Sequence, residues 1–282
     1  MRGHGKPLSN SQRSDIAQKY AAGSSGLRLS NEYSISVARV QRIATAAGVA
    51  LRGQSEASRV YGCDHNFFDI IDTEAKAYWL GFIMADGCVT DRNRMKVAIA
   101  ASDVGHVEKL RTALRSDHPV RITHSEGGFN PHDSAEFSIR SDALVAGLAA
   151  HGVCERKSLT ATPPMLSADM TRHFWRGMVD GDGYITSTDR GGRLRWSIGL
   201  TGSLATSEAF AAFAASICGT KSTVQRNNSI WKLTVSGNTK ARAVMDHLYG
   251  NAAVYLDRKM ARYRSALESI AAPRRGRAKR GE

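Results

Sequence analysis

Two aspartates, Asp86 and Asp182, share one sequence setting. Each ends a mostly apolar run of helical length and precedes glycine, in Ala77-Tyr-Trp-Leu-Gly-Phe-Ile-Met-Ala-Asp86-Gly87 and His173-Phe-Trp-Arg-Gly-Met-Val-Asp-Gly-Asp182-Gly183. Mg²⁺ prefers oxygen ligands, and a divalent metal held by carboxylates assists the hydrolysis of a phosphodiester bond. Paired acids in this pattern therefore permit metal-dependent phosphodiester chemistry. The alternative, that Asp-Gly only ends a helix in a turn, fits two matched copies less well.

The helices that carry these acids are predicted to pack against each other. Small residues stand four apart in each run, Gly81 and Ala85 in the first, Gly177 and Gly181 in the second, and leave a bare stripe on one helical face. Contact between the stripes would bring the two aspartates side by side on a pseudo-twofold axis. The glycine after each aspartate is predicted to take the left-handed turn that ends a helix.

At these residues the chain resembles the LAGLIDADG family of homing endonucleases. Residues 79–87 and 175–183 occupy the nine motif positions, and the acid that binds the catalytic metal in that family falls on Asp86 and Asp182. The resemblance extends over about residues 66–265 and implies a site-specific endonuclease that cuts both strands of double-stranded DNA. It also implies Mg²⁺ at the two acids, with Mn²⁺ as an alternative.

The motif is not matched at every position. Met84 replaces the first acid in the first copy, whereas Asp180 keeps that acid in the second copy. Arg176 stands where a small apolar residue is usual. These departures are expected to affect packing and the helix rim more than the chemistry.

The same order of predicted elements follows each motif: a hairpin, a helix, two strands and a second helix. The sequence therefore predicts an α+β chain with a duplicated αββαββα fold, in which two antiparallel saddle sheets are related by a pseudo-twofold axis. Each repeat ends in a matching exit, Cys-Glu-Arg-Lys157-Ser and Leu-Asp-Arg-Lys259-Met. The resemblance implies that Lys157 and Lys259 are the basic residues near the two sites. A phosphate clamp or a surface lysine is the alternative for each.

Apolar residues alternate with basic or polar ones along the predicted strands, as Leu194, Trp196 and Ile198 do with Arg193 and Arg195. One sheet face is therefore expected to be core and the other basic. A twisted antiparallel sheet with basic side chains on its open face fits the major groove. An ordinary solvated face is the alternative for any single strand. The residues predicted to contact DNA from the sheets are Arg94, Lys96, Arg121, Arg193, Arg195 and Lys232.

An all-α unit is predicted before the first motif. Helical periodicity over residues 11–20, 27–32 and 37–47 gives a helix-turn-helix layout, with Ser34 at the turn position where glycine is customary. Residues 27–43 resemble the helix-turn-helix modules of serine recombinases and related regulators. The third helix would then be the recognition helix, and its outward residues are Ser36, Ala38, Arg39 and Arg42. A solvated basic helix is the alternative.

The charge distribution favours a polyanionic partner. The net charge is +13, and the excess lies at the ends: residues 1–60 hold nine Lys/Arg and three acids, and the last ten hold five and one. Each phosphate that such residues neutralise releases counterions. The four cysteines have neither disulfide-framework nor zinc-finger spacing, and no run has membrane length. A cytoplasmic protein with no membrane partner is expected.

The predicted domains are a helix-turn-helix domain (1–52), a linker (53–65), two repeats (66–165 and 166–271) and a basic tail (272–282). The chain after Tyr263 is expected to be disordered. Because both repeats lie in one chain, a monomer is expected. An RNA-splicing maturase and a non-cleaving regulator on the same fold are the other hypotheses. An intein is not expected, because the chain starts with Met and ends in Gly-Glu.

Overall fold

The computed structural model describes residues 7–51, 61–90, 92–125, 132–155 and 161–271. Contacts between residues divide the chain into two compact units. The first holds residues 1–65 and 111–119, and the second holds residues 66–110 and 120–282.

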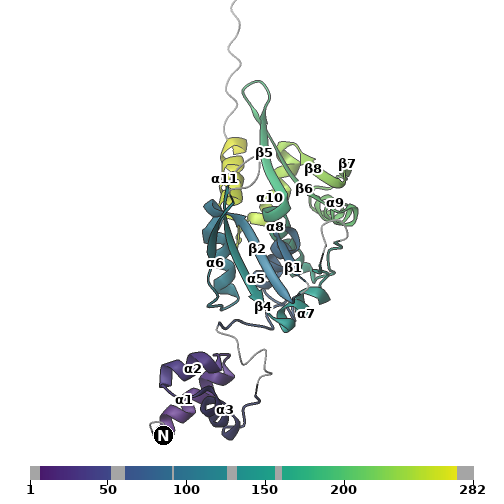
Figure 1. Cartoon of the computed structure of the whole chain (residues 1–282). Coiled ribbons are helices and arrows are strands. Elements are labelled where there is room, and N and C mark those ends of the chain that lie inside the picture. The colour runs from purple at the N-terminus through teal and green to yellow at the C-terminus, as the bar shows by residue number, and fades with distance from the viewer. Residues whose placement is uncertain (1–6, 52–60, 91, 126–131, 156–160, 272–282) are drawn as a thin grey trace, which may run out of the picture. The chain divides into compact units, whose positions relative to one another are not determined.

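The described residues before residue 52 in the first unit form the helices α1 (Asn10–Ala21), α2 (Gly26–Tyr33) and α3 (Val37–Ala46) (Figure 1). Each begins after a serine whose hydroxyl accepts a hydrogen bond from a backbone N–H of the first turn. Between α2 and α3, Ser34 takes a left-handed conformation with φ of 52°. The core of this unit consists of Ile16, Tyr20, Leu29, Ile35, Val40 and Ala44. The three predicted helices are present.

The second unit contains the duplication (Figure 1). The first repeat runs α5 (Glu74–Asp86), β1 (Gly87–Thr90), β2 (Arg94–Ala100), a 3₁₀ turn (Ala101–Asp103), α6 (Val104–Ala113), β3 (Arg121–Ser125), β4 (His132–Arg140) and α7 (Asp142–Ala150). The second runs α8 (Ala168–Asp182), β5 (Gly183–Asp189), β6 (Leu194–Gly202), α9 (Leu204–Cys218), β7 (Gln225–Asn227), β8 (Ile230–Ser236) and α10 (Asn238–Tyr249). The predicted order of elements is confirmed in both repeats.

Each repeat builds a four-stranded antiparallel sheet with the same topology. The strand order is β1-β2-β4-β3 in one sheet and β5-β6-β8-β7 in the other. The inward residues of the central strands are fully buried, as Val97 and Phe137 are in the first sheet and Ile198 and Leu233 in the second. Since side chains alternate along a strand, the other face of each sheet is left open.

The motif helices α5 and α8 pack with their backbones in contact at two glycines. A Cβ on Gly81 would overlap the carbonyl oxygen of Phe174 and lie 3.0 Å from its carbon. A Cβ on Gly177 would overlap the carbonyl oxygen of Tyr78 and lie 2.7 Å from the nitrogen of Phe82. Only glycine fits at either position without moving the helices apart.

The glycines after the two aspartates do not take the predicted left-handed turn, so this prediction is wrong. Gly87 has φ −84° and Gly183 φ −95°, and both start a strand in extended conformation. Space is the reason for glycine there. A Cβ on Gly87 would lie 2.7 Å from a methyl carbon of Ile83, and one on Gly183 would lie 2.6 Å from the Cα of Val179.

The prediction of disorder after Tyr263 is wrong for residues 264–271. These residues continue the last helix, α11 (Asp257–Ala271). Met260, Tyr263 and Ala266 recur at helical spacing and are buried, and the Trp196 indole nitrogen donates to the Ser269 hydroxyl at 3.2 Å. The basic tail, 272–282, lies outside the described residues. Among the described residues, no helix is both long and apolar enough to cross a bilayer.

Candidate active site and nucleic-acid surfaces

Asp86 and Asp182 are the last residues of α5 and α8. The small residues of the helix contact extend to these ends, because a Cβ on Gly181 would lie 2.5 Å from that of Ala85 and 3.2 Å from an Asp86 carboxylate oxygen. Asp86 is partly buried and Asp182 is exposed. The backbone oxygen of Asp182 accepts a hydrogen bond from the Thr201 hydroxyl at 2.9 Å. The two carboxylates therefore end neighbouring helices at the same end of the interface.

A small hollow of 210 Å³ lies beside Asp86. Its wall includes Gly181 of the other motif helix, and Asp103 and Arg258, which form an ion pair at 2.9 Å. Asp103 and Arg258 come from different repeats, so the hollow is closed by both halves of the unit. Arg258 belongs to the exit sequence that contains Lys259 and Asp103 lies outside the motifs, but neither was predicted at this site.

Lys259 lies in the first turn of α11 with only 5% of its surface exposed. Its ammonium group donates to the carbonyl oxygen of Val179 at 3.2 Å and to that of Gly183, the residue after Asp182. Burial lowers the pKa of Lys259 to about 8, and the positive charge of Arg258 acts in the same direction. The negative charges of Asp180, Asp86 and Asp182 raise this pKa and offset part of the effect. A cation with a lowered pKa therefore lies within electrostatic reach of both motif acids. Its predicted counterpart, Lys157, lies outside the described residues.

The described residues hold no group of three or more His, Cys, Asp or Glu side chains that would form a complete metal cage. Mg²⁺ does not require one, since it is commonly held by one or two carboxylates together with waters and substrate phosphates. The donor set at the helix ends, one carboxylate from Asp86 and one from Asp182, fits that pattern.

The open face of the first sheet carries the three predicted basic residues. Arg94 and Lys96 alternate with buried residues on β2, and Arg121 on β3 lies opposite Glu136 of β4. Directly opposed residues share a face, so the pair Arg94 and Arg140 adds a fourth basic side chain that the sequence analysis missed. Lys96 forms an ion pair with Glu136 at 2.7 Å.

In the second sheet, Arg195 on β6 and Lys232 on β8 lie on the open face, because Lys232 pairs with Thr201 and side chains alternate along β6. The Lys232 ammonium lies 4.7 Å from the ring centre of Tyr184. Tyr184 bonds to the Thr234 hydroxyl at 2.5 Å, so this lysine and tyrosine form a fixed platform on the face.

The β5–β6 hairpin ends in a basic hollow of 730 Å³. Arg190, Arg193 and Arg195 all line it, and Arg190 is a further residue that the sequence analysis missed. Leu194 was predicted to face the core but is 37% exposed, because it starts β6 at the hairpin end, outside the buried part of the sheet.

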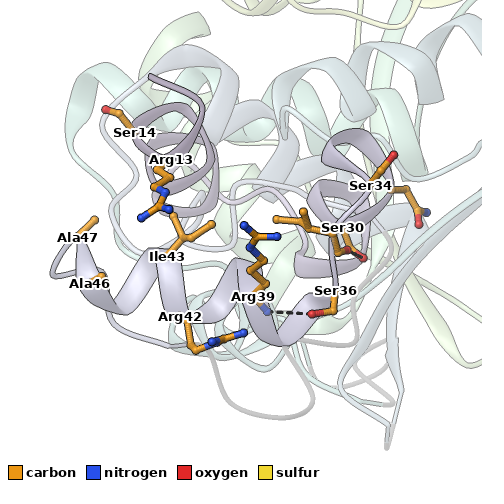
Figure 2. A pocket seen from close by; sticks show the side chains of 12 residues that line it. Arg13, Ser14, Ser30, Ser34, Ser36, Arg39, Arg42, Ile43, Ala46 and Ala47 are labelled. Atoms are coloured by element: carbon orange, nitrogen blue, oxygen red, sulfur yellow. Dashed lines mark hydrogen bonds between the residues drawn. The ribbon is translucent and has the colours of Figure 1, made fainter. Parts of the chain in front are cut away.

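The first unit has a hollow of 1270 Å³ on the side of α3 (Figure 2). Arg39 and Arg42 of α3 line it, as predicted for outward residues, together with Arg13 of α1. The Ser36 hydroxyl accepts a bond from the Arg39 backbone N–H at 3.3 Å and so fixes the start of α3 beside the hollow. Arg13 was not predicted because it lies on α1, outside the predicted recognition helix.

No family sequence model matches the chain, and no curated protein matches it. Solved structures do match. A LAGLIDADG homing endonuclease, I-GzeII in complex with its DNA target, is 7% identical over 69% of this chain and 89% of its own, with a TM-score of 0.50. The chain has the LAGLIDADG homing endonuclease fold. The LAGLIDADG homing endonuclease I-LtrWI bound to target DNA is 10% identical, covers 70% of this chain and 89% of its own, and has a TM-score of 0.48. I-SmaMI bound to an uncleaved DNA target in the presence of calcium ions is 12% identical, covers 68% of this chain and 90% of its own, and has a TM-score of 0.43.

In this chain's LAGLIDADG fold, Arg176 is part of the core, so this departure from the motif affects packing, as expected, and not the helix rim. It is 1% exposed, and its guanidinium donates to Glu74 at 2.6 Å and to the carbonyl oxygens of Leu248 and Val254 at 2.8 Å each. A buried guanidinium is tolerated because its donors are paired in this way. The large side chain at a motif position that is usually small is therefore accommodated by partners in α5, in α10 and in the segment between α10 and α11.

The first acid of the second LAGLIDADG motif, Asp180, is fully buried. It accepts hydrogen bonds from the hydroxyls of Tyr78 and Tyr249 at 2.6 and 2.7 Å and from the Leu256 N–H at 2.7 Å. Burial raises the pKa of Asp180, and these hydrogen bonds act in the opposite direction. Unlike Asp182 it has no access to a substrate phosphate.

Proposed function

We propose that this protein is a site-specific, homing-type DNA endonuclease that hydrolyses phosphodiester bonds in both strands of duplex DNA with a divalent metal ion. The observation that carries the proposal is the pairing of Asp86 and Asp182 at the ends of two helices in backbone contact. Two equivalent acids related by a duplication suit a substrate whose two strands are related by near-twofold symmetry.

Each motif acid serves one strand in this proposal. Mg²⁺, or Mn²⁺ in its place, would be held by Asp86 and Asp182 with phosphate oxygens and would supply charge stabilisation and water activation. Lys259, fixed by the carbonyl oxygens of Val179 and Gly183, would steady the charge that develops on the phosphate. Lys157 takes the same role at the other site.

The sheets supply the binding surface for the duplex. The open faces carry Arg94, Lys96, Arg121 and Arg140 in one repeat and Arg195 and Lys232 in the other, and Arg193 lies beside Arg195 in the hollow of the β5–β6 hairpin. Antiparallel ribbons with such side chains can lie in successive major grooves and read base edges. Two matching sheets in one chain also support a monomer as the active species.

The first unit adds a helix-turn-helix contact in this proposal. Arg39 and Arg42 of the recognition helix α3 and Arg13 of α1 line one hollow, which gives three cations for phosphates or guanine edges (Figure 2). Such a module would lengthen the recognised site beyond what the two sheets cover.

The direct test is to incubate the full chain with a fragmented genomic DNA library in Mg²⁺ and to sequence the cut ends. Cuts at one site with a constant stagger are expected. EDTA should abolish the cuts and added Mg²⁺ should restore them, because the proposed hydrolysis depends on a metal ion held by Asp86 and Asp182.

The control is the double variant Asp86→Asn/Asp182→Asn, which keeps the shape of both side chains and removes their charge. It should bind the recovered site and leave it uncut. Binding without cleavage by the wild type would contradict an endonuclease and favour a regulator. Preference for structured RNA over duplex DNA would favour a maturase.

A further inference from the structure

Asp180 is a buried carboxylate whose hydrogen bonds join three elements. Tyr78 donates from α5 of the first repeat, Tyr249 from the last residue of α10, and Leu256 from the segment before α11. Burying a carboxylate is unfavourable unless its oxygens are hydrogen-bonded. Moving any of the three donors away would leave an oxygen of Asp180 unpaired, so the carboxylate restrains the positions of all three.

Helix packing alone does not require this carboxylate. The equivalent motif position of the first repeat holds Met84, which is also buried, at 3% exposure. An apolar side chain therefore satisfies the same position between α5 and α8. Asp180 differs from Met84 in accepting three hydrogen bonds, one of them from the chain segment that precedes α11.

That segment, residues 253–257, is anchored at several points to the motif helices and α6. Glu74 accepts from the N–H groups of Ala253 and Val254 at 2.8 and 3.2 Å. Lys109 donates to the carbonyl oxygen of Tyr255 at 3.2 Å and to Asp257 at 2.8 Å. Leu256, at the centre of the segment, is anchored by Asp180.

The anchored segment leads directly into Lys259. The Lys259 backbone N–H donates to the Leu256 carbonyl oxygen at 3.0 Å, which makes Leu256 the start of the helical turn that carries the lysine. A shift of Leu256 would therefore move the ammonium group away from the carbonyl oxygens of Val179 and Gly183.

We propose that Asp180 is a positioning residue: it fixes Leu256 and the start of α11 so that the Lys259 ammonium group stays beside Asp86 and Asp182. The inference rests on the proposed nuclease function for its catalytic consequence, but the placement of Lys259 is independent of that function. Asp180 itself is fully buried and acts through these contacts.

The first experiment measures Lys259 without DNA. Acetylation by an amine-reactive reagent is followed by mass spectrometry in the full chain, with exposed Lys240 as the internal reference. In the wild type Lys259 should react far more slowly than Lys240. Asp180→Asn should raise the Lys259 rate at least about tenfold, and Tyr249→Phe, which removes one donor and is milder for folding, should raise it less. Unchanged Lys259 rates in both folded variants would overturn the proposal.

The matched control is Asp246→Asn. Asp246 also accepts from a tyrosine across α10 and α11, Tyr263 at 2.9 Å, but its other carboxylate oxygen pairs with Arg242 of its own helix at 3.2 Å and not with the 253–257 segment. Its loss should leave the Lys259 rate unchanged. An equal increase in the Lys259 acetylation rate in this variant would overturn the proposal, because any loosening of α11 would then be enough to expose the lysine.

The second experiment measures single-turnover cleavage of the recovered site. Asp180→Asn should slow cleavage by about 10- to 100-fold with DNA affinity within about twofold of the wild type. Added to Lys259→Ala, it should slow cleavage no further, because it acts through the lysine. Additive losses, or equal losses in affinity and rate, would overturn the proposal. An inactive wild type with the expected labelling result would contradict the nuclease function and leave the positioning role supported.

Discussion

Gly81 and Gly177 occupy equivalent positions in the two repeats, and each lies against the backbone of the other repeat's motif helix. A Cβ on Gly81 would lie 3.1 Å from the nitrogen of Met178, and one on Gly177 would lie 2.7 Å from that of Phe82. This reciprocal contact determines how closely α5 and α8 approach. It therefore also determines the separation of the acids at their ends.

Gly81→Ala should destabilise the protein by more than about 3 kcal/mol, because the added methyl group meets backbone atoms that cannot move without separating the helices. Thermal unfolding of the full chain checks this. Gly105→Ala is the matched control, since a Cβ there meets nothing within 4 Å. It should leave stability unchanged or raise it by up to about 1 kcal/mol. Equal melting temperatures for the two variants would contradict the reciprocal contact.

Much of the fold could be predicted because the pattern of each helix and strand is visible in its own residues and the same order of elements occurs in both repeats. Helical and strand periodicity gave the order of elements, and the small residues at Gly81 and Gly177 gave the helix contact. What could not be predicted includes the conformation at the helix ends. Gly87 was expected in a left-handed turn, but it is extended, and the reason for glycine is the proximity of Ile83, one turn earlier in α5. That close approach depends on the backbone conformation of Gly87, which the residue types alone do not determine.

The site was predictable to a similar extent. Asp86 and Asp182 stand out by repetition, and Arg39 by its place on a capped helix. Arg140 was missed because its partner across the sheet depends on strand register, which the sequence does not reveal. The burial of Arg176 was missed because its partners, such as Glu74, lie far away in the chain.

Ser34→Gly should stabilise the first unit by about 1 kcal/mol. The φ of 52° at Ser34 is unfavourable for a residue with a Cβ and is readily adopted by glycine. Hydrogen exchange of the core amides of α2 and α3, measured in the full chain, reports on this unit alone. Slower exchange there, with no change in α5 and α8, is expected. Faster exchange would show that the serine side chain contributes more than its backbone strain removes.

Arg39→Ala should weaken DNA binding and reduce the slope of log K against log salt by about 1 if the arginine contacts a phosphate. Fluorescence anisotropy on the recovered site between low and physiological salt checks this. Lys19→Gln is the control, because Lys19 is paired with Glu32 at 2.6 Å and with Asp15 at 3.0 Å, and it is not part of the hollow beside α3. An identical loss for both variants would indicate general electrostatic attraction only.

Acidification below pH 6.5 should destabilise the second unit through His106. This side chain is 2% exposed, and burial, followed by the charge of Lys109, lowers its pKa from 6.5 to about 3. Below pH 6.5 the unfolded chain binds a proton that the folded chain does not, so this stability is present above pH 6.5 and is lost as pH falls toward 3. The loss approaches about 1.4 kcal/mol per pH unit for one such group.

Urea unfolding at pH 7 and pH 5 checks the prediction, with His106→Gln as the comparison. The variant should be less stable at pH 7, because the histidine bonds to the Tyr78 hydroxyl at 2.9 Å, but its stability should depend less on pH. The same pH dependence in both proteins would assign the effect to other groups, such as His173, whose pKa burial lowers to about 4.

The central claim is that Asp86 and Asp182 each serve one strand of the DNA. The most direct measurement is cleavage of the recovered site, with each strand carrying a different fluorophore, by the single variants Asp86→Asn and Asp182→Asn in Mg²⁺. Each variant is predicted to cut one strand only, and the two variants should cut opposite strands. Cutting of both strands at the wild-type rate by either variant would contradict the claim.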